Sequence, residues 1–395
     1  MIISYRYFWF ASLLSNISAG AQSVGVMWLL GDDHLQSWVL ITFQFSNLAG
    51  TLGGISLGAR LINKLGFRRT VVLSSIMEFV FCIIVAASSY APSGHLSMMQ
   101  AYIVAFLSLG GPFAAGIGGP AWISLISKWP GSHSQTKQIL YDSAQFQIGR
   151  FLGPIFGGAL MLVTRNEVQI SSIANAATYA CIAVILFLTI EFADRVQPAP
   201  KKALTTSGMD FVKSKPLWGI AALAFSADSS RIFLARLIQQ NGNSSLIYSI
   251  SIAVLAVSAA GAAFMATKRA HSELSLTQIG LIGITLGLLI WTAVPMIGAI
   301  GWIIGAFFVG ASVSISYASL LSRILSEFGQ SSKFSGISAA MSIRTIFSAL
   351  GGIVLAIFVP VFGSAALLFS AWTTTGAGIL LAKERENFSE LQELT

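Results

Sequence analysis

The chain has 395 residues, of which 55% are hydrophobic and only 10% are charged. Its mean hydropathy of +0.76 excludes a water-soluble globular protein and indicates a polytopic membrane protein. The formal net charge of +8 does not indicate nucleic-acid binding, because membrane orientation explains where the basic residues lie. The two cysteines, Cys82 and Cys181, both fall in apolar segments, which argues against a disulfide framework or a Cys-based metal site.

Hydrophobic segments of about the length that crosses a bilayer recur along the whole chain. The first of them is too long to be the apolar part of a signal peptide. The sequence therefore predicts an all-α membrane protein with twelve transmembrane helices, at residues 8–30, 36–58, 70–89, 97–126, 137–163, 169–191, 216–238, 245–267, 275–296, 298–322, 334–360 and 363–382.

The basic residues are distributed unevenly between the two sides of this arrangement. If the N-terminus lies in the cytoplasm, most of the 23 Lys and Arg residues fall in cytoplasmic segments, and Arg165 is the only one in an outside loop. Loops rich in Lys and Arg remain on the cytoplasmic side of a membrane. We therefore expect both termini in the cytoplasm.

The longest polar stretch divides the chain into two halves. Residues 193–215 contain Pro, Lys, Ser and Thr in the proportions of a linker, between a six-helix bundle at 1–192 and a second bundle with a short cytoplasmic tail at 216–395. A small repeat supports this division. Arg150 in the fifth span and Arg344 in the eleventh are each followed, seven and eight residues later, by a Gly-Gly pair. Parallel duplication of two equivalent halves would place these residues in equivalent positions.

The fifth span combines a glycine stripe, a proline and a charge. Gly149, Gly153 and Gly157 recur every fourth residue, so on a helix they form one smooth face for close packing. Pro154 lacks a backbone N–H and leaves the carbonyl group of Arg150 without its helical partner. A charged side chain in mid-helix costs about 2.5–3.5 kcal/mol on insertion scales, so we expect a function for it.

These residues, through Gly158, form the pattern Gly-x-x-x-Gly-Pro-x-x-Gly-Gly. The pattern resembles the antiporter motif in the fifth helix of major facilitator superfamily exporters. The resemblance implies two pseudo-symmetric six-helix bundles, alternating access, and export rather than uptake. The alternative is a packing face with a proline kink and no role in the direction of transport.

A second motif lies between the second and third spans. Physically, a glycine there permits a tight turn, and the bases can pair with acidic groups or cap helix C-termini. The segment resembles the cytoplasmic signature of the same superfamily, which implies a gating role. Asn63 replaces the Asp of the signature, and this weakens its charge latch. An ordinary basic loop is the alternative reading. The matching residues are Lys64, Gly66, Arg68 and Arg69.

The first span, including Asn16 and the Gln22-Ser23-Val24 segment, is similar to the subfamily that contains the enterobactin exporter and macrolide efflux pumps. The fourth span, with Gly118-Gly119-Pro120-Ala121-Trp122, is also similar to that subfamily. Its members often carry a carboxylate shortly after the Asn, where this chain has Ala19. The resemblance implies a bacterial inner (cytoplasmic) membrane protein.

Few ionisable residues remain inside the spans, and none of them is His. Arg150 and Arg344 lie near the expected midplane, so we assign them to substrate binding, together with Arg231 and Asn16. Asp228 and Arg231, three residues apart, can meet on one helix face as a proton-responsive pair, or simply neutralise each other. Asp228 and Glu78 are the candidate proton-coupling residues; a lone structural acid is the alternative for Glu78.

The sequence thus predicts a secondary active transporter that exports a small amphiphilic molecule in exchange for protons. Two mid-span arginines favour an anionic, siderophore-like substrate. A multidrug or macrolide efflux pump, an uptake symporter and a non-transporting receptor remain alternatives. We expect no enzyme and no cofactor, because no catalytic or nucleotide-binding motif is present. The expected partners are the substrate, protons and the lipid bilayer, without nucleic acid, and the chain is expected to act as a monomer.

Overall fold

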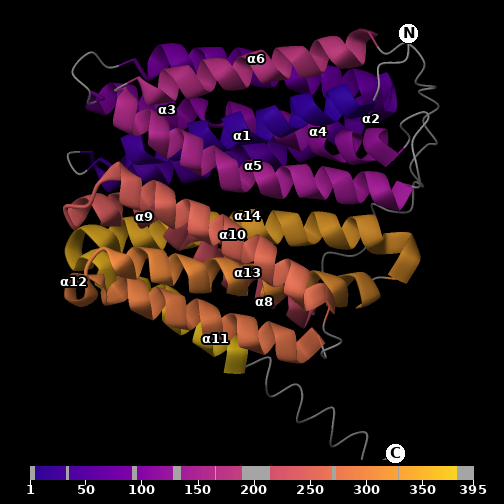
Figure 1. Ribbon diagram of the computed structural model, residues 1–395. Helices are drawn as coiled ribbons and strands as arrows, with labels where there is room; N and C mark the ends of the chain where they lie inside the picture. Colours follow the sequence, from indigo (N-terminus) through magenta and orange to yellow (C-terminus); the bar gives the residue numbers. More distant parts are fainter. Residues whose placement is uncertain are drawn as a thin grey trace, which may run out of the picture. The chain divides into compact units, whose positions relative to one another are not determined.

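The computed structural model describes residues 5–32, 35–90, 96–127, 135–164, 166–188, 214–268, 273–327 and 329–379. Helices make up nearly all of these ranges, and no strand occurs in them. The chain divides into two compact units, an N-terminal unit (Met1–Ala199) and a C-terminal unit (Pro200–Thr395) (Figure 1). Of the predicted linker at 193–215, only Ser214 and Lys215 are among the described residues.

The N-terminal unit contains the first six predicted spans. The second and third of them form one long element that changes direction at Gly66, and a short break divides the fourth. The helices of this unit are α1 (Tyr5–Leu30), α2 (Ser37–Ser88), α3 (Met98–Leu107), α4 (Gly110–Ser127), α5 (Gln135–Val163) and α6 (Glu167–Leu188).

The C-terminal unit contains the other six predicted spans. Its first span is interrupted by a π-helical turn, and its last lies mainly on a helix over residues 367–379. The remaining elements are α8 (Lys215–Leu223), η2 (Ala224–Asp228), α9 (Ser229–Gln240), α10 (Ser245–Lys268), α11 (Glu273–Thr292), α12 (Val294–Ile297), α13 (Ile300–Glu327), α14 (Gly329–Phe362) and the 3₁₀ turn η3 (Gly363–Ala366).

Each of the twelve predicted spans lies mainly on helix, as expected for a membrane protein with an all-α fold. In the described ranges, 7 helices are long and apolar enough to cross a membrane, and shorter apolar helices accompany them. One expectation needs correction, because the predicted loop at 59–69 is helical except at Gly66. That residue has φ 80° and ψ 170°, a conformation that glycine adopts without a Cβ penalty. The connection between spans two and three is therefore a kink.

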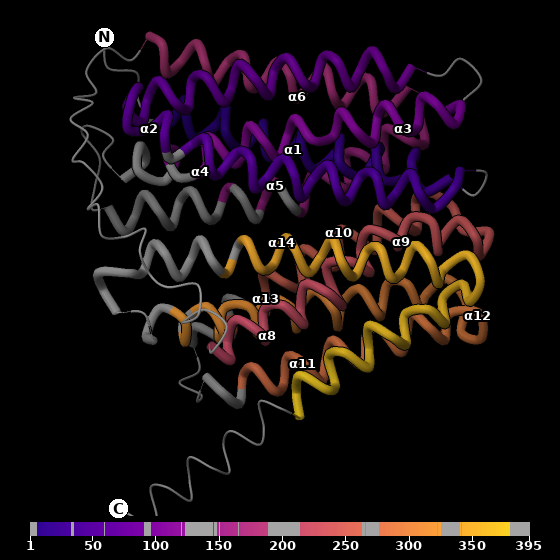
Figure 2. Tube along the Cα trace, turned by 180° about the vertical axis from the view of Figure 1, so that it is seen from behind, coloured from indigo at the N-terminus to yellow at the C-terminus, as the bar shows by residue number. Residues whose placement is uncertain are grey.

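Packing inside each unit follows the same scheme. In the N-terminal unit α1 packs against α5 and α6, and α2 packs against α4 and α6. In the C-terminal unit α14 packs against α8, η2 and α9, which together form the first span of that unit, and Figure 2 shows α14 running beside them. α13 packs against α10 and α11. The first and fifth spans of each half are thus neighbours in both units.

Candidate functional site

The glycine stripe of α5 lies against α1. A Cβ atom added to Gly153 would come within 2.7 Å of both the Cα atom of Gly20 and the carbonyl oxygen of Ile17. Gly149 and Gly157 approach α1 as closely, one turn to either side. α5 continues as a helix through Pro154, and both Pro154 and Gly158 are buried. The stripe therefore brings two helix backbones together, as its spacing predicts.

Two of the predicted substrate-binding residues lie on or near this seam. Asn16 faces Gly149 and donates a hydrogen bond from Nδ2 to the carbonyl oxygen of Ser12, at 3.0 Å. Its amide is thus used within α1. Arg150 belongs to α5, but its side chain lies outside the described residues.

The motif after Gly66 connects α2 to the end of α6. Arg68 donates a hydrogen bond from Nη2 to the carbonyl oxygen of Phe187, at 2.8 Å. Phe187 lies in the last turn of α6, where carbonyl groups have no helical partner and a cation is favourable. Asn63, Lys64 and Arg69 are exposed. Arg68 therefore caps a helix C-terminus.

The C-terminal unit contains an ion pair between two different spans. Arg344 of α14 donates from Nε to Oδ2 of Asp228, at 2.7 Å, and from Nη2 to Oδ1, at 3.0 Å. The guanidinium carbon of Arg344 also lies 4.7 Å from the centre of the Tyr317 ring. A two-point contact of this kind fixes both the distance and the orientation of the groups. The i, i+3 spacing predicts Arg231 as the partner of Asp228, whereas a partner 116 residues away has no local signal in the sequence.

Arg231 lies in the same electrostatic neighbourhood, because Asp228 and Arg344 both act on its charge. Its Nε atom is buried without a hydrogen-bond partner among the described residues. Asp228 itself ends the π-helical turn η2. Such turns widen a helix locally and are frequent at functional sites. Three predicted site residues therefore meet at one place, although the direct contact is between Asp228 and Arg344.

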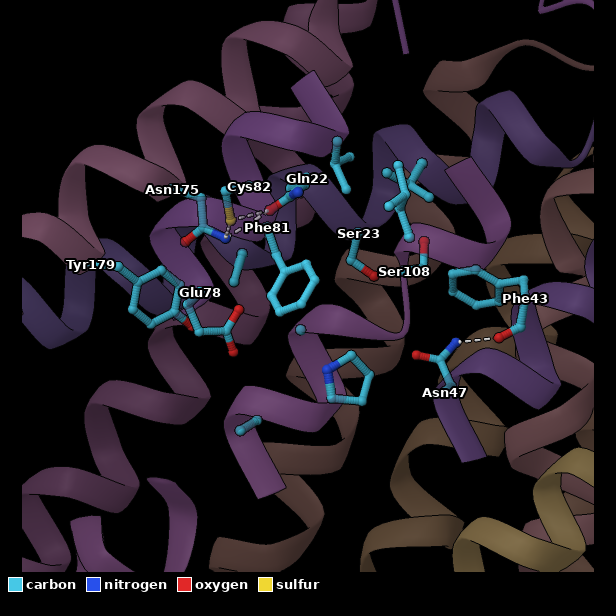
Figure 3. A pocket seen from close by; sticks show the side chains of 17 residues that line it. Gln22, Ser23, Phe43, Asn47, Glu78, Phe81, Cys82, Ser108, Asn175 and Tyr179 are labelled. Atoms are coloured by element: carbon cyan, nitrogen blue, oxygen red, sulfur yellow. Dashed lines mark hydrogen bonds between the residues drawn. The ribbon is translucent and has the colours of Figure 1, made fainter. Parts of the chain in front are cut away.

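A cavity of about 340 Å³ lies inside the N-terminal unit, and we call it the N-terminal cavity. Its wall is formed by residues of α1, α2, α4 and α6 and by the segment where α3 ends. Glu78 is the only one of its described lining residues with a carboxyl, amino or guanidinium group (Figure 3). The polar lining residues that sequence reasoning missed are Gln22, Ser23, Asn47, Cys82, Ser108 and Asn175.

The Glu78 side chain is only 7% exposed and lies beside the ring of Tyr179 in Figure 3. Within the described part of the chain, no residue forms a hydrogen bond or an ion pair with its carboxyl group. A buried carboxylate without a cationic partner is costly. The N-terminal cavity therefore holds a group that a proton or a cation would neutralise.

Amide and thiol groups surround this carboxyl group on one side. Asn175 donates from Nδ2 to Oε1 of Gln22, at 2.7 Å, and Cys82 also donates to that oxygen, at 3.6 Å between Sγ and Oε1. The Oδ1 atom of Asn175 is buried and has no hydrogen-bond partner among the described residues. Polar residues within apolar spans are the signal that could have indicated this cluster in the sequence.

The break between α3 and α4 also lines the N-terminal cavity, and a Cβ atom added to Gly111 just after it would lie 3.7 Å from Oε2 of Glu78. Ser108 ends α3, and Pro112 follows four residues later; both line the N-terminal cavity. Because proline has no N–H, the carbonyl oxygen of Ser108 lacks its regular helical donor. Irregular backbone in a membrane protein is tolerated where it lines a cavity.

No group of three or more His, Cys, Asp or Glu in the described ranges could hold a metal ion.

Solved structures share this architecture. The D-xylose–proton symporter has a TM-score of 0.72 and 15% identity, with 96% of this chain and 97% of that chain covered. The nucleoside transporter NupG has a TM-score of 0.73, 11% identity and coverage of 95% and 98%. A bacterial homologue of the human lysosomal transporter Spinster has a TM-score of 0.62, 15% identity and coverage of 95% and 93%. At these identities the similarity shows the fold alone.

No curated protein matches the sequence. The family model of the Major Facilitator Superfamily, however, matches residues 8–354, which is most of the chain. Its fold is consistent with secondary transport by alternating access. The chain therefore belongs to the major facilitator superfamily and is an integral membrane transporter rather than an enzyme.

Proposed function

We propose that this protein is a proton-coupled secondary transporter that exports a small amphiphilic molecule from the cytoplasm. Glu78 carries the proposal, because its carboxyl group is buried in a cavity wall without an ion-pair partner in the described ranges. Binding of a proton removes the cost of burying its charge, so protonation can be linked to ligand binding or to a conformational change. Tyr179 and Cys82 are the other titratable groups that face it in the cavity.

Asp228 is the second proposed coupling residue. Its carboxylate is neutralised by Arg344, and Arg231, three residues further along the same span, also interacts electrostatically with it. Protonation of Asp228 would release Arg344, and the freed guanidinium group could then contact a substrate. Both carboxyl groups bind a proton in this scheme: protonation of Glu78 removes a buried charge, whereas protonation of Asp228 releases an arginine.

The export direction is supported by the α5 motif. Its resemblance to the antiporter motif favours efflux, and its glycines pack on α1, as their spacing predicts for a close-packing face. The same fold occurs in a D-xylose–proton symporter, so an uptake symporter is the second candidate. The proposal includes the subfamily of enterobactin and macrolide exporters, a monomer in a bacterial inner membrane, and cytoplasmic termini. Loop charges support that orientation.

The siderophore-like anion expected from the two mid-span arginines receives less support from the geometry. Arg344 already binds a carboxylate within the protein, and the N-terminal cavity contains a carboxyl group in place of a base among its described residues. The exported substrate is therefore proposed to be amphiphilic. An anionic substrate would be exported only if Arg344 were first released from Asp228.

Vesicles with a fluorescent pH reporter test the proposal. Everted membrane vesicles would be acidified inside, and catecholate siderophores, macrolides and quaternary ammonium compounds would be added in turn. Export by antiport predicts that a substrate dissipates the proton gradient in everted vesicles and accumulates inside them. A substrate that enters right-side-out vesicles together with protons would identify an uptake symporter. Absence of any proton flux with a transported compound would contradict proton coupling.

A further inference from the structure

We infer that the N-terminal cavity is a binding site for a small organic cation, an ammonium-bearing molecule whose charge lies against Glu78. This inference rests on the proposed function and names the substrate class of the same transporter. The volume of about 340 Å³ is at the small end of the range for ligand pockets, so the site suits a compact molecule.

The carboxyl group of Glu78 is the strongest acceptor among the described lining residues. The Glu78 carboxyl group has no ion-pair partner in the described ranges, and the buried Oδ1 atom of Asn175 has no described hydrogen-bond partner. Pro112 leaves the carbonyl oxygen of Ser108 without its helical donor. The buried carboxyl group of Glu78 thus needs a hydrogen-bond donor or a positive charge within the cavity. A protonated amine supplies both, whereas an anion would add to the unfavourable electrostatics.

Aromatic rings complete the site. Phe43, Phe81 and Tyr179 line the same cavity as Glu78, and Figure 3 shows the Phe81 ring between the Glu78 carboxyl group and Ser23. The face of an aromatic ring attracts an ammonium group, and its apolar surface accommodates alkyl substituents. A carboxylate combined with aromatic walls is the arrangement that proteins use for organic cations. A simple packing defect would not combine these groups with unpartnered acceptors.

The two cysteines of the chain make this inference testable without knowing the substrate. Cys82 lines the N-terminal cavity, whereas Cys181 is exposed on α6 and is not among the lining residues. In a Cys181→Ser background, Cys82 is the only thiol. Two methanethiosulfonate reagents of similar size and opposite charge, ethyltrimethylammonium and ethylsulfonate, report the electrostatic preference of the cavity. The second reporter is Ser23→Cys in a chain whose two native cysteines are replaced. Ser23 also lines the cavity and is exposed, so the reagents reach it more easily.

We expect the ratio of the cationic to the anionic rate at both reporters to exceed, by at least about tenfold, the ratio that the same reagents show with 2-mercaptoethanol, because a unit charge near Glu78 experiences its field through a low dielectric. Glu78→Gln should remove the preference, and Glu167→Gln, the same change on α6 outside the cavity, should preserve it. Millimolar choline should slow the reaction, whereas its uncharged carbon analogue 3,3-dimethylbutan-1-ol should not. Labelling rates are compared only among variants that have the same melting temperature.

A rate ratio equal to that of 2-mercaptoethanol, or no reaction at either reporter, would overturn the inference. Faster reaction with the sulfonate, abolished by Arg150→Ala, would also overturn it and would indicate an anion site. The labelling experiment does not depend on transport. A cation preference without proton flux in vesicles would contradict the proposed function alone, whereas proton-coupled export without a cation preference would contradict only this inference.

Discussion

Asp228 and Arg344 form a two-point ion pair that joins the first and fifth spans of the C-terminal unit. Their side chains are 15% and 32% exposed, so the pair is largely shielded from solvent. Beside it, Trp218 and Phe347 stack edge to face at 5.9 Å, which joins α8 and α14 at a second point. The pair therefore joins the two spans by a polar contact that protonation of Asp228 would release.

Removal of Asp228 alone should cost more than removal of both members of this pair. Asp228→Asn leaves Arg344 without its counter-charge, and breaking a buried pair costs about 3–5 kcal/mol, so we expect the lower end of that range. Arg344→Gln should cost less, because Arg231 still acts on Asp228. The double variant should recover at least about 1 kcal/mol of the loss. Thermal unfolding of purified protein in detergent gives the four values of the cycle. Strictly additive effects would show that the two side chains do not stabilise each other.

Close packing of α5 on α1 should make Gly153→Ala destabilising. The added methyl group would come within 2.7 Å of backbone atoms of α1, and overpacking of this kind costs about 1–3 kcal/mol. Gly376→Ala is the matched control, because this helical residue precedes no proline, a Cβ there meets nothing within 4 Å, and alanine favours helix by up to about 1 kcal/mol. The melting temperatures should therefore shift in opposite directions. An unchanged melting temperature in Gly153→Ala would contradict the close packing of α5 on α1.

The kink in α2 depends on a backbone conformation that only glycine adopts readily. Gly66→Ala should lower the unfolding free energy by about 1–3 kcal/mol, since φ 80° with ψ 170° strains any residue with a Cβ. Gly261→Ala on α10 is a control with ordinary helical geometry and open space around it. Denaturation curves of the two variants provide the comparison. Equal stability would mean that the kink straightens without cost.

Of the two arginines in the motif after Gly66, only Arg68 should contribute to stability. Arg68→Ala removes the cap on α6 and should cost about 0.5–1 kcal/mol, while Arg69→Ala, an exposed neighbour with the same charge, should cost almost nothing. Hydrogen exchange at the end of α6 is a direct local measurement. Faster exchange there in Arg68→Ala, with no change in Arg69→Ala, is the expected pattern. Identical effects would assign the contribution to loop charge alone.

Much of the fold could be predicted from the sequence because a membrane span has a clear hydropathy signal. The twelve spans, the turn at Gly66 and the packing face of Gly153 all follow from local composition or spacing. The interruption at Ser108 was also consistent with Pro112, but its connection to a cavity depends on helices distant in sequence.

The site was less predictable, because pairing across helices is not a local property. The i, i+3 spacing favoured Arg231 as the partner of Asp228, yet Arg344 makes the direct contacts from 116 residues away. The sequence identifies Glu78 as an isolated mid-span acid. It does not show that Gln22 and Asn175, which come from other spans, line the same cavity as Glu78. The roles of Arg150 and Arg344 in substrate binding remain predictions.

The most direct test of the central claim separates proton coupling from substrate movement in Glu78→Gln. In proteoliposomes, exchange of labelled for unlabelled substrate at equal pH requires alternating access but no net proton movement. The account predicts that Glu78→Gln retains this exchange and loses accumulation driven by a pH gradient, while Glu167→Gln retains both. Gradient-driven accumulation that survives in Glu78→Gln would contradict the assignment of Glu78 as the proton-coupling residue.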